Sequence, residues 1–223
     1  MFFRTSSIFG KNPITNVNSK TTIKSLLKSF EPEEIIVICD NTSMEQYKYF
    51  ANNFPTVYKT NRGNAGSFRL CVELCKVHYA EIYYFVEDDH LHLPNQKEWL
   101  LSGLKIFDFI SLYDHPDKYY LNMYKDLKRS IHITDQGYFI SAPSTVMTFA
   151  CLSSTLNKTR NILLEEDFTS SSLKTPLDHY LFLKLLKEGY SLGNPIPGRS
   201  THCEKDLLSP YIDWERYVKI LGY

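Results

Sequence analysis

The sequence has no excess of charge of either sign, because 25 Lys and Arg residues balance 25 Asp and Glu residues in a chain of 223. A balanced chain lacks the broad basic field that attracts nucleic acid or an anionic membrane surface. It also lacks an apolar stretch long enough to span a bilayer, and its first residues lack the charged start and apolar core of a signal peptide. We therefore expect a soluble, cytoplasmic protein with no nucleic-acid partner and no membrane span.

Cysteine is scarce, with five residues, an odd number, and no Cys-x-x-Cys pair. This pattern argues against a zinc site or a disulfide framework and favours buried thiols in a reducing compartment. Internal repeats, low-complexity tracts and obvious linkers are also missing. Because 43% of the residues are hydrophobic, residues 1–223 suffice for a single compact domain.

Strand and helix patterns alternate through the first half of the chain. The run at 35–39 is continuously apolar and β-branched, which is typical of a strand covered on both faces. The repeated strand-helix-strand order predicts an α/β fold, with a Rossmann-like, mostly parallel sheet between two layers of helices. The predicted strands are 35–39, 55–58, 82–86 and 107–112, and the predicted helices are 43–52, one that opens after the loop at 60–67, and 95–105.

The second half of the chain changes character. Short β-rich segments separated by a turn at 135–137 predict antiparallel strands added to the same sheet. Helices then return, and a loop-rich region begins at Pro195. The predicted strands are 131–134, 138–140 and 145–149, and the predicted helices are 152–165 and 177–189.

The apolar strand at 82–86 runs directly into three carboxylates, Glu87, Asp88 and Asp89, and the strand at 35–39 ends at Asp40. In open α/β sheets the ligand crevice lies at the carboxyl ends of the parallel strands. Carboxylates packed this closely repel one another unless water or a cation neutralises them. Mg²⁺ or Mn²⁺ would do so while also binding substrate phosphates. The alternative is a solvated acidic turn, but such turns seldom end so apolar a strand.

The loop at 61–67 contains two glycines and small polar residues where a helix begins. Such a loop lets backbone amides approach an anion, which the helix N-terminus also favours. It matches neither a Walker loop nor the Rossmann fingerprint, so an ordinary turn is the alternative.

Together these motifs carry a resemblance: a strand ending in an acid, an Asn-x-Gly-Ser loop, and an apolar strand ending in Glu-Asp-Asp. They resemble the nucleotide-sugar-binding half of GT-A-fold glycosyltransferases, especially family-2-like ones, and are similar to small bacterial and large-DNA-virus sugar transferases. The resemblance implies that the triplet is the DXD motif. The family has Asp where this chain has Glu87, a departure that leaves Asp89 as the first candidate for direct metal ligation, with Glu87 beside it.

The resemblance also implies a donor site in a half that covers about residues 1–94. The end of the first strand and Asp40 would face the nucleoside, the loop and helix would lie near the nucleotide or its phosphates, and Asp88 would reach the ribose or donor sugar. The implied donor-binding residues are Arg4, Thr5, Ser6, Asp40, Asn64, Gly66, Ser67, Arg69 and Asp88.

In the other half, about residues 95–223, Asp178 opens a predicted amphipathic helix. In inverting GT-A enzymes a carboxylate at this place is the general base, although Asp178 could instead only complement the helix dipole. The segment 197–204 resembles the loop that gives the metal a histidine, here His202, whose alternative is a polar loop histidine. His90 and His92 alternate with leucines and are expected on the polar face of an extended segment.

Two further segments have ordinary interpretations. Residues 114–117 combine Asp and Pro and are expected to form a turn. Arg199 would clamp a phosphate or pair with Glu204, and the sequence leaves both open.

The resemblance therefore implies a metal-dependent, inverting hexosyl- or deoxyhexosyltransferase. It would use Mn²⁺ or Mg²⁺ to move a sugar from a nucleoside-diphosphate donor, expected to be UDP-linked, to a hydroxyl of a glycan or glycoprotein acceptor. Two alternatives stay open: a nucleotidyltransferase that makes a nucleotide-sugar, and a non-catalytic carbohydrate- or nucleotide-binding module. The missing Gly-rich basic signature near the first strand counts against the former, and the presence of Asp178 and His202 against the latter.

Overall fold

A computed structural model, which describes residues 1–9 and 12–222, contains a central nine-stranded sheet with strand order β3-β2-β1-β4-β9-β6-β10-β8-β7. The first four of these strands are mutually parallel, as the alternation of strands and helices predicts. They are β1 (Phe2–Thr5), β2 (Ile36–Asp40), β3 (Thr56–Thr60) and β4 (Ile82–Glu87). The α/β fold class predicted from the sequence is therefore confirmed.

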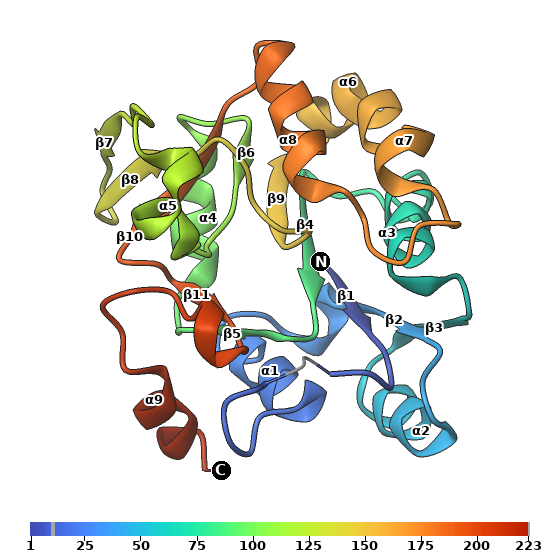
Figure 1. Ribbon diagram of the computed structural model, residues 1–223. Coiled ribbons are helices and arrows are strands. Elements are labelled where there is room, and N and C mark those ends of the chain that lie inside the picture. Colours follow the sequence, from blue (N-terminus) through green and yellow to red (C-terminus); the bar gives the residue numbers. More distant parts are fainter. Residues whose placement is uncertain (10–11, 223) are drawn as a thin grey trace.

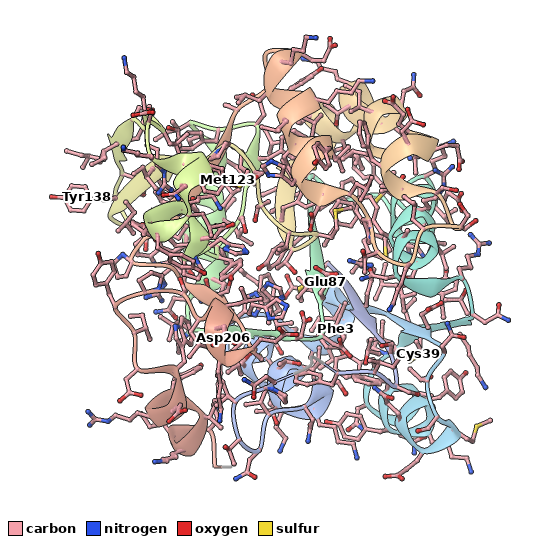
Figure 2. The ribbon with its side chains drawn as sticks, viewed as in Figure 1. Phe3, Cys39, Glu87, Met123, Tyr138 and Asp206 are labelled. Atoms are coloured by element: carbon pink, nitrogen blue, oxygen red, sulfur yellow. The ribbon has the colours of Figure 1, made fainter. Side chains whose placement is uncertain are left out.

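The other strands extend this sheet with mixed pairing. β9 lies antiparallel between β4 and β6, β10 is parallel to β6, and the hairpin of β7 and β8 closes the far edge. Figure 2 shows Tyr138 of that hairpin pointing away from the molecule. These strands are β6 (Phe109–Ile110), β7 (Ile131–Ile133), β8 (Tyr138–Ser141), β9 (Phe149–Leu152) and β10 (Leu192–Ile196).

Helices cover both faces of the sheet, because the central strands alternate their side chains between two apolar clusters (Figure 1). In β1, Phe2 belongs to the cluster under α3, α6 and α8, while Phe3 belongs to the cluster under α1, α2 and α4. The helices are α1 (Ser19–Leu26), α2 (Met44–Asn53), α3 (Gly63–Leu74), α4 (Gln96–Leu104), α5 (Asp117–Tyr120), α6 (Ser153–Leu163), α7 (Glu166–Thr169), α8 (Asp178–Lys187) and α9 (Trp214–Ile220).

A second, two-stranded sheet pairs β5 (His90–His92) with β11 (Ser200–His202) in antiparallel register. A third apolar cluster, which includes Leu91, Cys203 and Trp214, packs against it. This small sheet extends the chain beyond β4 and brings the C-terminal segment back to the end of that strand (Figure 1).

Several boundaries differ from the sequence prediction. α3 begins at Gly63, which has φ +75°, so Asn64 and Ser67 lie in the first turns of the helix instead of in a loop. β9 begins only at Phe149, since its pairing sets Phe149 opposite Phe85 of β4. The predicted strand at 107–112 shrinks to two residues, and β10 includes Pro195, where the sequence predicted the start of a loop-rich region. The elements α1, β5, α5, α7, β10, β11 and α9 were not predicted.

All five cysteines are free and buried, as expected. No helix in the described part of the chain combines the length and the apolar character needed to cross a bilayer.

Candidate functional site

A cavity of about 540 Å³ lies at the carboxyl ends of β1, β2 and β4. Its wall also includes the start of α3 and two residues from the loop before α8. The structure brings nine of the predicted site residues together here: Arg4, Thr5, Ser6, Asp40, Asn64, Ser67, Glu87, Asp88 and Asp89. Figure 2 shows Glu87 of β4 and Phe3 of β1 close together in the centre of the view.

Arg4 organises the wall of this cavity from the end of β1. Its buried guanidinium lies over the ring of Phe68, and Nη1 donates to the backbone oxygen and side chain of Asn64 at 2.9 and 2.7 Å and to Ser67 Oγ at 3.3 Å. Its Nη2 pairs with Glu87 Oε1 at 3.1 Å. Arg4 therefore neutralises the first carboxylate of the triplet and holds the start of α3 against β4.

Asp88 is held between strand ends. Its Oδ2 accepts from Thr5 Oγ1 at 2.6 Å and from the backbone N–H of Ser6 at 3.2 Å. Burial, followed by the negative charge of Asp89, raises the pKa of Asp88 to about 8. Near neutral pH this carboxyl is thus largely protonated, which lowers the charge repulsion within the triplet.

Asp40 fixes the entry to α3. Its Oδ1 accepts from the backbone N–H of Arg62 at 2.7 Å, and its Oδ2 accepts from Asn41 Nδ2 at 2.9 Å. Asn41 has φ +52°, a left-handed conformation that asparagine tolerates. The acid at the end of β2 therefore shapes the loop that lines the cavity.

Asp89 forms the centre of an acid-histidine group in which His90 is buried and Asp89 and His202 are partly buried. Its Oδ2 lies 3.1 Å from His202 Nε2, and its Oδ1 lies 2.9 Å from His90 Nδ1. Although burial opposes ionisation, hydrogen bonds from His202 and His90 hold the pKa of Asp89 below its usual range. Burial likewise opposes the charge on His202, but its hydrogen bond to Asp89 raises the pKa of that imidazole. The pairing of β5 with β11 places His202 opposite His90 and so assembles this group.

Asp178 is the first residue of α8 and is partly buried. Burial, followed by the negative charge of Glu87, raises its pKa to about 6, while nearby Lys118 acts in the opposite direction. The side chain of Lys118 is itself buried, and burial lowers its pKa to about 8. Asp178 therefore lies within electrostatic range of the acidic triplet, although it does not line the cavity.

Gly66, Arg69 and His202 are likewise outside the cavity wall. A Cβ on Gly66 would lie 2.7 Å from Arg62 Cβ, so this glycine permits close packing within the first turns of α3. Arg69 pairs with Glu166 at 2.8 Å and thereby ties α3 to α7. The donor-binding roles predicted for these two residues remain predictions.

Sequence reasoning missed Lys174 and Thr175, which line the cavity from the loop at 170–177. Their only sequence signal is that they precede a helix start, and no local pattern relates that loop to strands more than 80 residues earlier in the chain.

The prediction that His90 and His92 lie on the polar face of an extended segment was wrong, since both side chains are fully buried. His92 Nε2 lies 2.6 Å from the hydroxyl of Tyr84, and His90 bonds Asp89. The alternation of these histidines with leucines suggested that one face of the segment is polar. In the structure β11 pairs with β5 and α1 packs against it, so both faces are covered.

Two other segments make contacts that the sequence did not predict. Asp114 lies in a buried network, accepting from Tyr119 Oη at 2.5 Å and from Asn194 Nδ2 at 2.9 Å. Arg199 lies with its guanidinium 5.0 Å from the ring centroid of Trp99 and donates to a backbone oxygen of the segment before α4.

No protein-family model and no curated protein matches this chain. Solved structures do match. S. aureus TarS, residues 1–349, has a TM-score of 0.50 and 13% identity over 87% of this chain and 57% of its own. GalNAc-T7 with UDP, GalNAc and Mn²⁺ has a TM-score of 0.57 and 12% identity, and the match covers 90% of this chain and 42% of its own. CMP:2-keto-3-deoxy-manno-octonic acid synthetase complexed with CTP has a TM-score of 0.51 and 14% identity, and the match covers 99% of this chain and 97% of its own.

TarS and GalNAc-T7 are GT-A glycosyltransferases, so the fold of this chain is GT-A-like, as the sequence predicts. The chain spans only 57% and 42% of those two structures. At such low identity the likeness establishes the fold alone.

Proposed function

We propose that this protein is a metal-dependent, inverting glycosyltransferase that uses a nucleoside-diphosphate sugar, UDP-linked, and an acceptor hydroxyl on a glycan or glycoprotein. One observation carries the proposal: Asp89 and His202 meet at 3.1 Å beside a 540 Å³ cavity at the carboxyl ends of the parallel strands. That edge is where open α/β sheets bind ligands. The likeness to GalNAc-T7, solved with UDP and Mn²⁺, supports the choice of donor and cation.

The residues at the strand end suit Mn²⁺ or Mg²⁺. Among the described residues no group of three or more His, Cys, Asp or Glu side chains is arranged to hold a metal, but these cations need only one or two protein ligands when phosphates and water supply the rest. The carboxylate oxygen of Asp89 is the type of ligand that these cations prefer, and His202 Nε2 lies 3.1 Å from it. Asp89 and His202 would hold the cation once His202 Nε2 has released the proton that it donates to Asp89, while Glu87 would join only by giving up its ion pair with Arg4.

The donor half, about residues 1–94, would hold the nucleotide, and the acceptor half, about 95–223, would hold the sugar acceptor. Arg4, Asn64 and Ser67 form a polar wall in which the Nε of Arg4 has no hydrogen-bond partner among the described residues. The guanidinium supplies positive charge beside the cavity, although its Nε and Nη2 atoms are themselves buried. Lys174 supplies a second positive charge on the wall, where it would face the diphosphate.

For transfer, Asp178 would accept the proton of the acceptor hydroxyl. The hydroxyl oxygen forms a bond to the anomeric carbon as the bond from that carbon to the diphosphate oxygen breaks. The new bond forms on the opposite face, so the configuration inverts, and the proton remains on Asp178. A bound divalent cation supplies Lewis-acid stabilisation of the charge on the departing diphosphate.

Donor binding is the direct test of this function. Calorimetric titration with a panel of nucleotide-sugars is expected to show tight binding of one donor in the presence of Mn²⁺ and much weaker binding in its absence, because a cation held by Asp89 and His202 would also bind the diphosphate. If no donor shows metal-dependent binding, the proposal fails and a non-catalytic binding module is favoured.

The pH dependence of transfer should identify the base. Asp178 has a pKa raised to about 6 from 3.8, so it is ionised at pH 7 and becomes protonated as the pH falls. The specificity constant kcat/KM is therefore expected to fall about tenfold per pH unit below about pH 6. Lys118→Met removes a positive charge that lowers this pKa, and should move the acid limb to higher pH. An acid limb near pH 4 in the unmodified protein would argue against Asp178.

One observation favours a second candidate, a nucleotidyltransferase. The CMP:2-keto-3-deoxy-manno-octonic acid synthetase structure matches over 99% of this chain and 97% of its own, whereas TarS and GalNAc-T7 are covered over only 57% and 42% of their own chains. Such an enzyme would release pyrophosphate from a nucleoside triphosphate and a sugar, while a glycosyltransferase would release a nucleoside diphosphate. Phosphate-product analysis with CTP or UTP as substrate separates the two.

A further inference from the structure

His90 has a buried environment that the proposed function does not yet use. It begins β5, and its side chain is 0% exposed. Its Nδ1 lies 2.9 Å from Asp89 Oδ1 and 3.3 Å from Thr148 Oγ1. The ring lies edge-on between Tyr113 and His202, with centroid separations of 5.4 and 5.1 Å. These contacts on several sides fix the orientation of the imidazole.

The hydrogen bond assigns the proton on this ring. An ionised carboxylate can only accept hydrogen bonds, so the proton between Asp89 Oδ1 and His90 belongs to Nδ1. The Nε2 of His90 is buried and has no hydrogen-bond partner among the described residues. Within the described structure His90 therefore makes side-chain hydrogen bonds through Nδ1 alone, and the proton on Nδ1 is donated to Asp89.

The two oxygens of Asp89 have separate partners. Oδ1 binds His90, and Oδ2 lies beside His202. A hydrogen bond to one carboxylate oxygen restricts rotation about the side-chain torsion and keeps the other oxygen in place. Mutation of a group that orients a metal ligand in this way commonly lowers metal affinity about 10- to 100-fold.

We infer that His90 is a positioning residue, which holds Oδ1 of Asp89 so that Oδ2 remains beside His202 to bind a divalent cation. This inference rests on the proposed use of a metal by the same site. His90 itself need not touch the cation.

The histidine two residues later offers a matched control. His92 is equally buried in the same strand, but its Nε2 lies 2.6 Å from Tyr84 Oη and its Nδ1 lies near the backbone oxygen of His90. Its substitution perturbs the same short sheet without removing a contact to Asp89.

The test is the affinity of the full chain for Mn²⁺ alone, measured by electron paramagnetic resonance of free Mn²⁺, with folding checked by circular dichroism. His90→Leu removes the donor to Asp89 and should weaken Mn²⁺ binding about 10-fold or more. His90→Asn places an amide N–H where Nδ1 lies and should restore most of the affinity. His90→Gln places its amide nearer to the Nε2 position and should not. His92→Asn should bind Mn²⁺ as the unmodified protein does.

Equal affinity in the His90→Asn and His90→Gln variants overturns the inference, as does unchanged affinity in a folded His90→Leu variant. If His90→Leu does not fold, the comparison of Asn with Gln still decides. An equal loss in His92→Asn also overturns it, because the effect would then follow from disturbing β5. Absence of Mn²⁺ binding by the unmodified protein, with or without UDP, rejects the metal in the proposed function itself and the inference with it.

Discussion

Replacement of Asp178 by Asn is expected to reduce the rate of sugar transfer about 10²- to 10⁴-fold, the usual contribution of a general base. The substitution keeps the size of the side chain but removes its negative charge and its capacity to take a proton. Donor affinity should stay within a few fold of normal, since Asp178 does not line the cavity at the strand ends. Single-turnover kinetics with a saturating donor would measure the loss in the chemical step separately from binding.

The competing explanation is that Asp178 only complements the dipole of α8. In that case Asp178→Asn would cost about 0.3–1 kcal/mol of stability and leave transfer almost unchanged. Asp167, an exposed acid in the first turn of α7, provides the matched control. Asp167→Asn tests the same change of charge at another helix start, and it should leave transfer unaffected. Full activity in the Asp178→Asn variant would exclude it as the base.

The parallel half of the fold could be predicted because its signals are local. The continuous apolar runs that became β2 and β4 bury both faces, and each ends at the acid expected from the sequence, Asp40 and Glu87. Helices α2, α4, α6 and α8 also begin and end within a few residues of their predicted limits. Since parallel strands bring their carboxyl ends to one edge, these signals also predicted that Asp40 and the acidic triplet share a site.

The remaining features depend on contacts between distant segments. β5 and β11 have three residues each and are separated by more than 90 residues, so no local pattern shows that His90 and His202 face each other. The position of β9 is set by its register with β4, although the β-branched residues lie earlier, at 145–149. The ion pair between Arg4 and Glu87 arises from the register of β1 and β4, which places the two residues opposite each other.

Asp89→Ala is expected to have the second large effect, a loss of at least about 100-fold in donor affinity in the presence of Mn²⁺. Asp89 carries the central negative charge of the group with His90 and His202. Without Asp89, a bound cation would keep only His202 as a protein ligand and would no longer be attached to the end of β4. Donor affinity without metal should change little, so the titration with and without Mn²⁺ separates the two contributions.

A loss of donor binding could also follow from unfolding, because Asp89→Ala leaves the buried imidazole of His90 and the partly buried imidazole of His202 without their shared acceptor. Thermal unfolding therefore has to accompany the titration, with Asp126→Ala as a control at an exposed acid. If a folded Asp89→Ala variant kept full metal-dependent donor affinity, the cation would have to bind elsewhere. A folded variant that binds the donor equally weakly with and without Mn²⁺ would instead tie the metal dependence to this carboxylate, and would explain why an apolar strand ends in three acids.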